Sequence, residues 1–218
     1  MRLFKYLADS GLPIHLFLSH SFVKEYYLTV GIREGVQVEL IDLEELETYK
    51  ELEGLSYTVP VSANPEKDTA SYHIVQNAKI ELVDRVRREY QDCGALSHFA
   101  WIDFNICQMF KNIPECLEYL RNRLRREPGL FMPGCWWLTE GQENLFTSIN
   151  WRFCGSFFIG DAESIEKFHK VYRENFKKTV ESVGILTWEV NMWHYLELKD
   201  LFGPVWYIAD HNDSIIRA

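Results

Sequence analysis

Short apolar runs alternate with longer amphipathic stretches along this chain, and that alternation constrains its fold more than any other feature. The runs LPIHLFLSH (12–20) and VQVELID (36–42) have the composition of strands, and SFVKEYYLTVG (21–31) between them has helical spacing and ends in Gly. Together they form a strand, helix, strand unit. Because repeated units of this kind build sheets covered by helices, the pattern predicts an α/β fold with a mostly parallel central sheet flanked by helices.

The alternation continues to the end of the chain. A long amphipathic helix is predicted over about residues 69–91, and its apolar stripe consists of Val75, Ala78, Leu82, Val86 and Tyr90. A buried strand is predicted at 95–103, followed by a helix that opens at Pro114 and has Leu117, Leu120 and Leu124 in one stripe. Next come a short strand within 128–138 and a strand at 149–161 that is broken by Gly155. The last predicted elements are a long helix after the N-cap Asp161, a helix over 187–202 and a strand at 205–210.

The length and composition fit one compact globular unit. The chain has 218 residues, 47 % of them hydrophobic and 15 % aromatic, which predicts a single domain spanning 1–218. No apolar run is long enough to cross a bilayer, and the first residues carry charges too early for a signal peptide. We therefore expect a soluble, cytoplasmic protein.

The net charge of −9 argues against nucleic acid as a partner, because non-specific binding to phosphates is driven by basic surface. An anionic ligand would need local help from a metal ion or from a few aimed donors. The five cysteines show no CxxC pair, and we expect reduced, mostly buried thiols: Cys93, Cys107, Cys116, Cys135 and Cys154.

Two familiar phosphate-binding motifs are missing from the sequence. There is no GxxxxGK[ST] loop and no GxGxxG after a strand, so a bound phosphate would depend on a divalent ion with oxygen ligands. Asp103 follows an apolar strand, and Asn105 points to the same side two residues on. His211 lies in a polar loop after the last strand. Taken singly, each of these also fits ordinary turn chemistry or a solvated side chain.

Two helical segments carry further polar candidates. Tyr72, Gln76 and Lys79 share one helical face with Asn77 beside them, and this face suits either a donor nucleotide or plain solvent exposure. Glu189 lies near the start of a helix beside Trp188. A carboxylate there either is simply stabilised by the helix dipole or, beside an indole, contacts a sugar ring.

Six blocks, in this order, carry a resemblance to a known family. They are YHIVQNAKIELV (72–83), FAWIDFNI (99–106), FMPGCWW (131–137), NWRFCGSFFIGD (150–161), LTWEVNMWHYLE (186–197) and WYIADHNDSII (206–216). Together they resemble the HtrL/YibB family of predicted glycosyltransferases, which includes viral and animal members, over about residues 12–216. The resemblance implies a GT-A fold, a single α/β domain that binds a nucleotide sugar with a divalent ion.

The order of these blocks is also similar to that in the glycogenin-like transferases, in which a D-x-D motif and a His late in the sequence hold Mn²⁺. That similarity implies Asp103 as the first carboxylate and His211 as the late ligand of Mn²⁺ (or Mg²⁺). Asn105 stands in the place of the second carboxylate, where an amide is a weaker ligand.

Two more blocks imply residues around the donor sugar. NWRFCGSFF resembles the strand that lines the sugar, which implies roles for Arg152, Cys154 and Gly155. TWEVN resembles the segment near the reacting carbon, which implies catalytic roles for Glu189 and Asn191. Tyr72, Gln76, Asn77 and Lys79 then become candidates for the donor nucleotide.

The leading hypothesis is a metal-dependent glycosyltransferase that moves a sugar from a UDP-linked donor to a glycan or glycoprotein hydroxyl. Similarity to the glycogenin-like group favours retention of the anomeric configuration. Two alternatives use the same donor site: a non-catalytic module that binds nucleotide sugars or glycans, and a hydrolase of nucleotide sugars in which water attacks.

Overall fold

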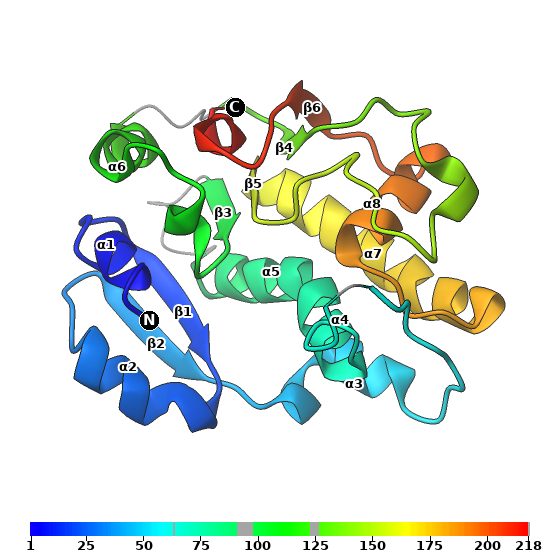
Figure 1. Ribbon diagram of the computed structural model, residues 1–218, viewed down its shortest axis with the longest axis horizontal. Coiled ribbons are helices and arrows are strands. Elements are labelled where there is room, and N and C mark those ends of the chain that lie inside the picture. The colour runs from blue at the N-terminus through cyan, green and yellow to red at the C-terminus, as the bar shows by residue number, and fades with distance from the viewer. Residues whose placement is uncertain (63, 91–97, 123–126, 218) are drawn as a thin grey trace.

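The computed structural model of the protein describes residues 1–62, 64–90, 98–122 and 127–217. Within these residues the fold is mixed α/β, as predicted, with eight α-helices and two sheets (Figure 1). The helices are α1 (Phe4–Ala8), α2 (Val23–Thr29), α3 (Glu47–Leu52), α4 (Ala70–Asn77), α5 (Lys79–Tyr90), α6 (Ile113–Asn122), α7 (Ala162–Val183) and α8 (Glu189–Leu198). The strands are β1 (Ile14–Leu18), β2 (Val36–Leu40), β3 (His98–Ile102), β4 (Leu130–Gly134), β5 (Phe157–Asp161) and β6 (Val205–Ile208).

The sheet prediction needs a correction, because the described strands form two sheets instead of one central sheet. β1 and β2 pair in parallel, from Ile14 opposite Val36 to Leu18 opposite Leu40. The larger sheet has the order β3-β5-β4-β6, in which β4 and β6 are parallel and β5 runs antiparallel to both of its neighbours. β3, β4 and β6 therefore point the same way, and their carboxyl ends meet at one edge.

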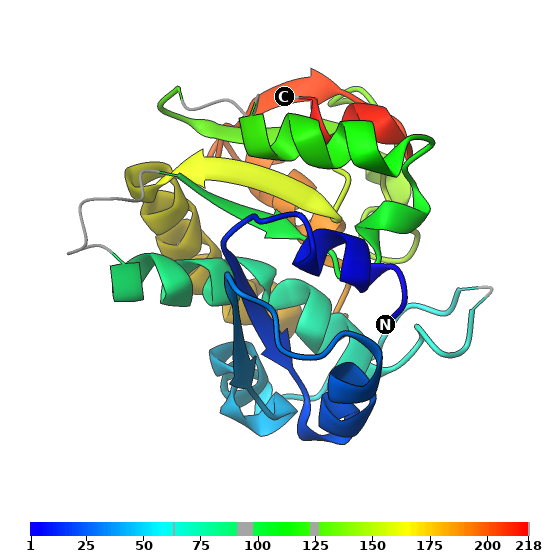
Figure 2. The ribbon, with the colours of Figure 1, turned by 90° about the vertical axis from the view of Figure 1, so that its left-hand side faces the viewer.

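The larger sheet is covered on both faces. In Figure 2, β5 lies between α6 on one side and α5 on the other. Alternate β5 residues face opposite layers, as the period of a strand requires: Phe158 packs edge-on against Trp193 of α8 at 5.6 Å between ring centroids, and Phe157 belongs to the other core cluster, which includes Leu120 of α6. This three-layer packing fixes the sheet edge on which the candidate residues lie.

The smaller sheet lies beside α5 at the N-terminal side of the molecule (Figure 1). A cavity of about 1130 Å³ is lined by β1, by α5 and by β3, among them Phe17, Leu82 and Trp101. This cavity explains two departures from prediction. β3 is partly exposed, with Ala100 on the surface, although a fully buried strand was expected. Val86 and Tyr90 of the predicted apolar stripe are only partly buried: they pack against the core and also line the cavity.

Three predicted elements have different bounds. The helix expected over 69–91 is α4 and α5, interrupted at Ala78, where φ is −82° and ψ is −4°. The strand expected at 149–161 is regular only from Phe157, because Gly155 and its neighbours form a loop. Residues 91–97, which include the end of the predicted helix and the start of the strand predicted at 95–103, lie outside the described residues, as does Leu124 of the helix predicted to open at Pro114.

No described helix is both long enough and apolar enough to cross a membrane.

The N-cap of α7 was predicted correctly at Asp161. Its carboxylate accepts hydrogen bonds from the Ser164 backbone N–H at 3.0 Å and from the Gly129 N–H at 2.5 Å. Burial alone would raise the pKa of Asp161, but these hydrogen bonds, with that of the Ser164 hydroxyl, outweigh it and lower the pKa below its ordinary value. The cap thus stabilises the folded state in its ionised form.

We predict that Asp161→Ala lowers the free energy of unfolding by about 1–2 kcal/mol at pH 7, the usual value of an N-cap. A carboxylate with a lowered folded-state pKa contributes stability above its unfolded pKa and loses it as the pH falls, so the difference from wild type should shrink toward pH 3. Urea unfolding at both pH values measures this. Glu163→Ala, at an exposed position in the first turn of the same helix, is the matched control and should lose much less stability. A pH-independent difference would contradict the role given to the carboxylate.

Candidate functional site

A second, smaller cavity of about 200 Å³ adjoins the large one at the carboxyl end of β3. Tyr72, Gln76, Lys79, Asp103 and Asn105 line both cavities. The smaller cavity brings together eight of the twelve residues proposed from the sequence: Tyr72, Gln76, Lys79, Asp103, Asn105, Gly155, Glu189 and His211. They come from α4, the start of α5, the loop after β3, the loop before β5, the start of α8 and the loop after β6.

The ammonium group of Lys79 lies at the centre of this arrangement. Its Nζ donates to the Glu189 carboxylate at 2.7 Å and to the Gly155 carbonyl at 2.9 Å, and it lies 3.2 Å from Asp103 Oδ1. The three N–H groups of a lysine therefore face three acceptors. Only 2 % of the Lys79 surface is exposed, a burial that a lysine tolerates when its charge is paired.

Asp103 lies between the buried Lys79 ammonium and solvent. Its backbone N–H continues the β3–β5 ladder by donating to the Ser156 carbonyl at 2.9 Å, which fixes the chain at the strand end. The Trp101 indole donates to Oδ1 at 2.6 Å, the same oxygen that faces Lys79. The Asp103 side chain is 36 % exposed, so its second carboxylate oxygen remains available to a ligand.

Gly155 is required where it stands because of Glu189. A Cβ on residue 155 would lie 2.1 Å from Glu189 Oε1 and 3.0 Å from a methyl group of Val190. Any side chain there would push Glu189 away from Lys79. Glu189 is 4 % exposed and begins α8, where the helix dipole also favours a carboxylate.

The pKa shifts follow from this burial and pairing. Burial by itself lowers the pKa of Lys79, but Asp103 and then Glu189 outweigh it and leave the pKa raised, so the ammonium stays charged. Burial raises the pKa of Glu189, and Lys79 opposes that shift. Within this trio the charges sum to minus one, and Lys67, which also lines the cavity, brings the formal sum to zero.

The three residues predicted to hold a metal ion, Asp103, Asn105 and His211, all line the smaller cavity. A carboxylate, an amide oxygen and an imidazole form a donor set that suits Mn²⁺ or Mg²⁺. The residues present therefore fit a divalent ion in chemical type.

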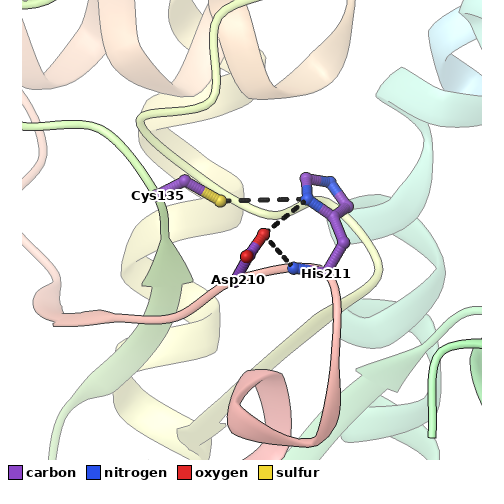
Figure 3. Close-up of side chains that lie close together, drawn as sticks. All are labelled: Cys135, Asp210 and His211. Carbon is purple, nitrogen blue, oxygen red and sulfur yellow. Dashed lines mark hydrogen bonds and ion pairs between the residues drawn. The ribbon is translucent and has the colours of Figure 1, made fainter.

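His211 also contacts a second group of possible ligands. Its Nδ1 lies 3.9 Å from Cys135 Sγ and 3.6 Å from Asp210 Oδ1 (Figure 3). The ring packs edge-on against Trp151 at 4.4 Å between centroids. Burial raises the pKa of the Cys135 thiol. Its Sγ lies 3.6 Å from that of Cys154. Both belong to the four described cysteines, which are free thiols as expected.

Four predicted residues, although described, line neither cavity: Asn77, Arg152, Cys154 and Asn191. Asn191 was expected near the reacting carbon, but it is fully buried and its amide donates to the Leu145 and Ser148 carbonyls at 2.7 and 2.8 Å. Its Oδ1 accepts from the Asn150 N–H at 2.8 Å. Asn191 thus fixes the loop before β5 and does not reach a ligand.

The other three are also engaged within the protein. Arg152 forms a bidentate ion pair with Glu197, at 2.6 and 2.7 Å, and lies 4.5 Å from the Trp206 ring centroid. Asn77 donates to the His73 and Thr187 carbonyls. Cys154 is 1 % exposed. These residues were predicted to face the donor, whereas their contacts position the segments that carry Lys79, Gly155 and Glu189.

Sequence reasoning missed several cavity residues and one cluster. The smaller cavity is also lined by Lys67, Gln108, Met109, Ile149, Trp151 and Ser156. Trp188, noted from the sequence beside Glu189, lines it as well. The Cys135, Asp210 and His211 group was missed because Cys135 lies far along the chain from the adjacent pair Asp210 and His211. A usable signal existed: Cys135 directly follows β4 and Asp210 closely follows β6, and these parallel neighbours end at one edge.

Comparison of the sequence with protein-family models gives no match, and comparison with curated proteins gives none either.

We predict that Lys79→Met lowers the free energy of unfolding by about 3–5 kcal/mol at pH 7, because it leaves the Glu189 carboxylate buried without its partner. Without Lys79, the folded-state pKa of Glu189 rises further. A carboxyl with a raised folded-state pKa costs stability as the pH rises past its unfolded pKa, so the variant should be least impaired at low pH. Chemical denaturation between pH 4 and pH 8 measures both effects.

The double variant Lys79→Met/Glu189→Gln serves as the control for this prediction. A neutral amide removes the unpaired charge, so the double variant should recover part of the lost stability and the steep pH dependence should disappear. A single variant as stable as wild type, or a double variant worse than the single one, would contradict the charge pairing described above.

Proposed function

We propose that the protein is a metal-dependent glycosyltransferase of the GT-A class, which transfers a sugar from a nucleoside diphosphate donor, UDP-linked, to a hydroxyl of a glycan or glycoprotein. The observation that supports this most is that eight of the twelve residues proposed from the sequence line one cavity. Six separate segments contribute them, although their order in the chain does not require them to meet.

The sizes of the two cavities suit such a donor. Typical small-molecule pockets occupy about 300–1,000 Å³, and the larger cavity, at about 1130 Å³, slightly exceeds that range and has room for a nucleoside. The smaller one, at about 200 Å³, is below the range, and we assign it only the sugar, beside Glu189. Tyr72, Gln76 and Lys79 line both, where the diphosphate would pass from one to the other.

The charge of the site supports the need for a metal. Two lysines, Lys67 and Lys79, and two carboxylates, Asp103 and Glu189, line the smaller cavity, so it has no excess positive charge with which to hold a diphosphate. A divalent ion bound by Asp103, Asn105 and His211 would neutralise the diphosphate and stabilise the charge that develops as it leaves.

The residues of the chain would then divide the work. Lys79 keeps Glu189 ionised and fixed, and this carboxylate stabilises positive charge at the anomeric carbon when its bond to the diphosphate oxygen breaks. The acceptor hydroxyl oxygen forms the new bond to that carbon, and its proton is passed to the departing diphosphate. Gly155 leaves the space that Glu189 occupies. Retention of configuration is part of this proposal and rests on the similarity to glycogenin-like enzymes.

A screen of UDP- and GDP-sugars with Mn²⁺, reading released nucleoside diphosphate, tests the proposal. Release from a sugar donor supports the enzyme, and added acceptor glycans separate transfer from hydrolysis. Turnover of no donor, combined with stabilisation by UDP and Mn²⁺ in a thermal melt, would overturn the enzyme and favour a binding module.

We predict that Asp103→Asn lowers Mn²⁺-dependent turnover by about 100-fold or more, because the amide is a poorer metal ligand and no longer balances Lys79. Thermal melting should show a folded protein. Asp200→Asn is the matched control, since Asp200 is exposed and its left-handed backbone (φ 55°) suits asparagine equally well. Full activity in Asp103→Asn would remove Asp103 from the metal site.

We also predict that Gly155→Ala abolishes turnover but retains UDP binding with Mn²⁺. The added methyl group would displace Glu189 from Lys79 without touching Asp103. Calorimetric titration of UDP, alongside the turnover assay, separates the two effects. Equal loss of binding and turnover would show that the loop carrying Gly155 has rearranged as a whole.

A further inference from the structure

Cys135, Asp210 and His211 each offer a ligand atom, and these three atoms lie within 4.8 Å of one another. Figure 3 shows the Cys135 sulfur and the Asp210 carboxylate both turned toward Nδ1 of His211. Around a tetrahedral Zn²⁺, ligand atoms lie roughly 3.3–3.7 Å apart. The observed 3.9 Å from Sγ to Nδ1 and 3.6 Å from Nδ1 to Oδ1 are within a few tenths of an ångström of that spacing.

The backbone around this cluster is fixed by the larger sheet. Cys135 follows β4 and donates its N–H to the Trp151 carbonyl at 2.9 Å, while the Ala209 N–H donates to the Gly134 carbonyl at 2.8 Å. The loop carrying Asp210 is closed by the Asn212 N–H, which donates to the Asp210 carbonyl at 2.7 Å. Two adjacent strand ends therefore hold the three side chains, and only small side-chain shifts are needed to surround an ion.

We propose that Cys135, Asp210 and His211 bind a thiophilic divalent cation, Zn²⁺, at a position distinct from that of the Mn²⁺ ion proposed at Asp103; the two proposed sites share His211, whose Nδ1 faces Cys135 and Asp210. A thiolate ligand selects zinc over manganese or magnesium, which prefer oxygen. On binding, the Cys135 thiol releases its proton to solvent and the sulfur forms the bond to the metal.

The exposure of the ligands indicates an open coordination position. The side chains of Asp210 and His211 are 77 % and 41 % exposed, so water completes the tetrahedron on the solvent side. His211 also lines the smaller cavity, which puts this ion at the rim of the proposed donor site.

Cobalt substitution tests the proposal directly. Purified protein, reduced with a phosphine that does not compete for metal, is titrated with Co²⁺ and then with Zn²⁺. We expect a thiolate-to-cobalt charge-transfer band with the intensity of one sulfur ligand, intense tetrahedral d–d bands, and loss of both when one equivalent of Zn²⁺ is added. Absence of the charge-transfer band would overturn the site.

Variants assign the ligands. Cys135→Ser should abolish the charge-transfer band, and Asp210→Asn, at an exposed position that does not affect folding, should weaken Zn²⁺ binding at least about tenfold. His20→Gln, an exposed histidine paired with Asp42, is the matched control and should bind as wild type. A band that survives Cys135→Ser, or unchanged affinity in Asp210→Asn, would contradict the assignment.

This inference does not depend on the proposed glycosyltransferase function. Asp103→Asn should leave Zn²⁺ binding unchanged. Cys135→Ser should leave Asp103 and Asn105, the oxygen ligands of the proposed Mn²⁺ site, in place. Loss of Zn²⁺ binding in Asp103→Asn would mean that a single metal site exists, and it would overturn the separate zinc site.

Discussion

The buried ammonium of Lys79 is the interaction on which the arrangement of the candidate site depends. It joins the start of α5 to the end of β3, to the loop before β5 and to the start of α8 through three acceptors: the Asp103 and Glu189 carboxylates and the Gly155 carbonyl. Without it, two carboxylates would face each other across a small cavity, and Glu189 would be an unpaired buried charge. Residues that touch no cavity, such as Asn191 and Arg152, hold the loop that Lys79 also holds.

The charge that remains after this pairing sets what the cavity can bind. Lys79 already faces two carboxylates and Lys67 balances the remaining negative charge, so the smaller cavity offers a diphosphate no excess positive charge. The strand ends supply two different ligand sets for cations. Asp103 and Asn105 offer oxygen after β3, whereas Cys135 offers sulfur after β4, and His211 lies between them after β6. Ligand softness therefore separates the two proposed ions although their sites lie close together.

The sequence predicted the α/β class and most elements, because their periodicity is local. The N-cap at Asp161 and the stripe of α7, from Ile165 to Val180, needed no knowledge of the rest of the chain. The division into two sheets was not predictable, since it depends on whether β1 reaches β3, and a cavity separates them. Asp103, Asn105 and His211 follow strands whose carboxyl ends meet at one edge, whereas the other converging residues were proposed from a shared helical face or from the family resemblance.

The misplaced residues have a different cause. Asn77, Arg152, Cys154 and Asn191 are polar or reactive neighbours of cavity residues in sequence, and a shift of one or two positions on a helix or loop turns a side chain from a cavity into the core. Motif likeness locates a segment but does not orient each side chain. The Cys135 cluster was missed because Cys135 and the adjacent pair Asp210 and His211 lie on two segments far apart in the chain, and spacing does not reveal such a meeting unless the strand order is known.

The anomalous scattering of manganese in crystals grown with UDP and Mn²⁺ tests the central proposal most directly. We expect an anomalous peak within bonding distance of Asp103, in the cavity that Lys79 and Glu189 also line, with the diphosphate attached to the same ion. A structure with UDP bound and no manganese at Asp103, or with manganese held only by Cys135 and Asp210, would contradict it.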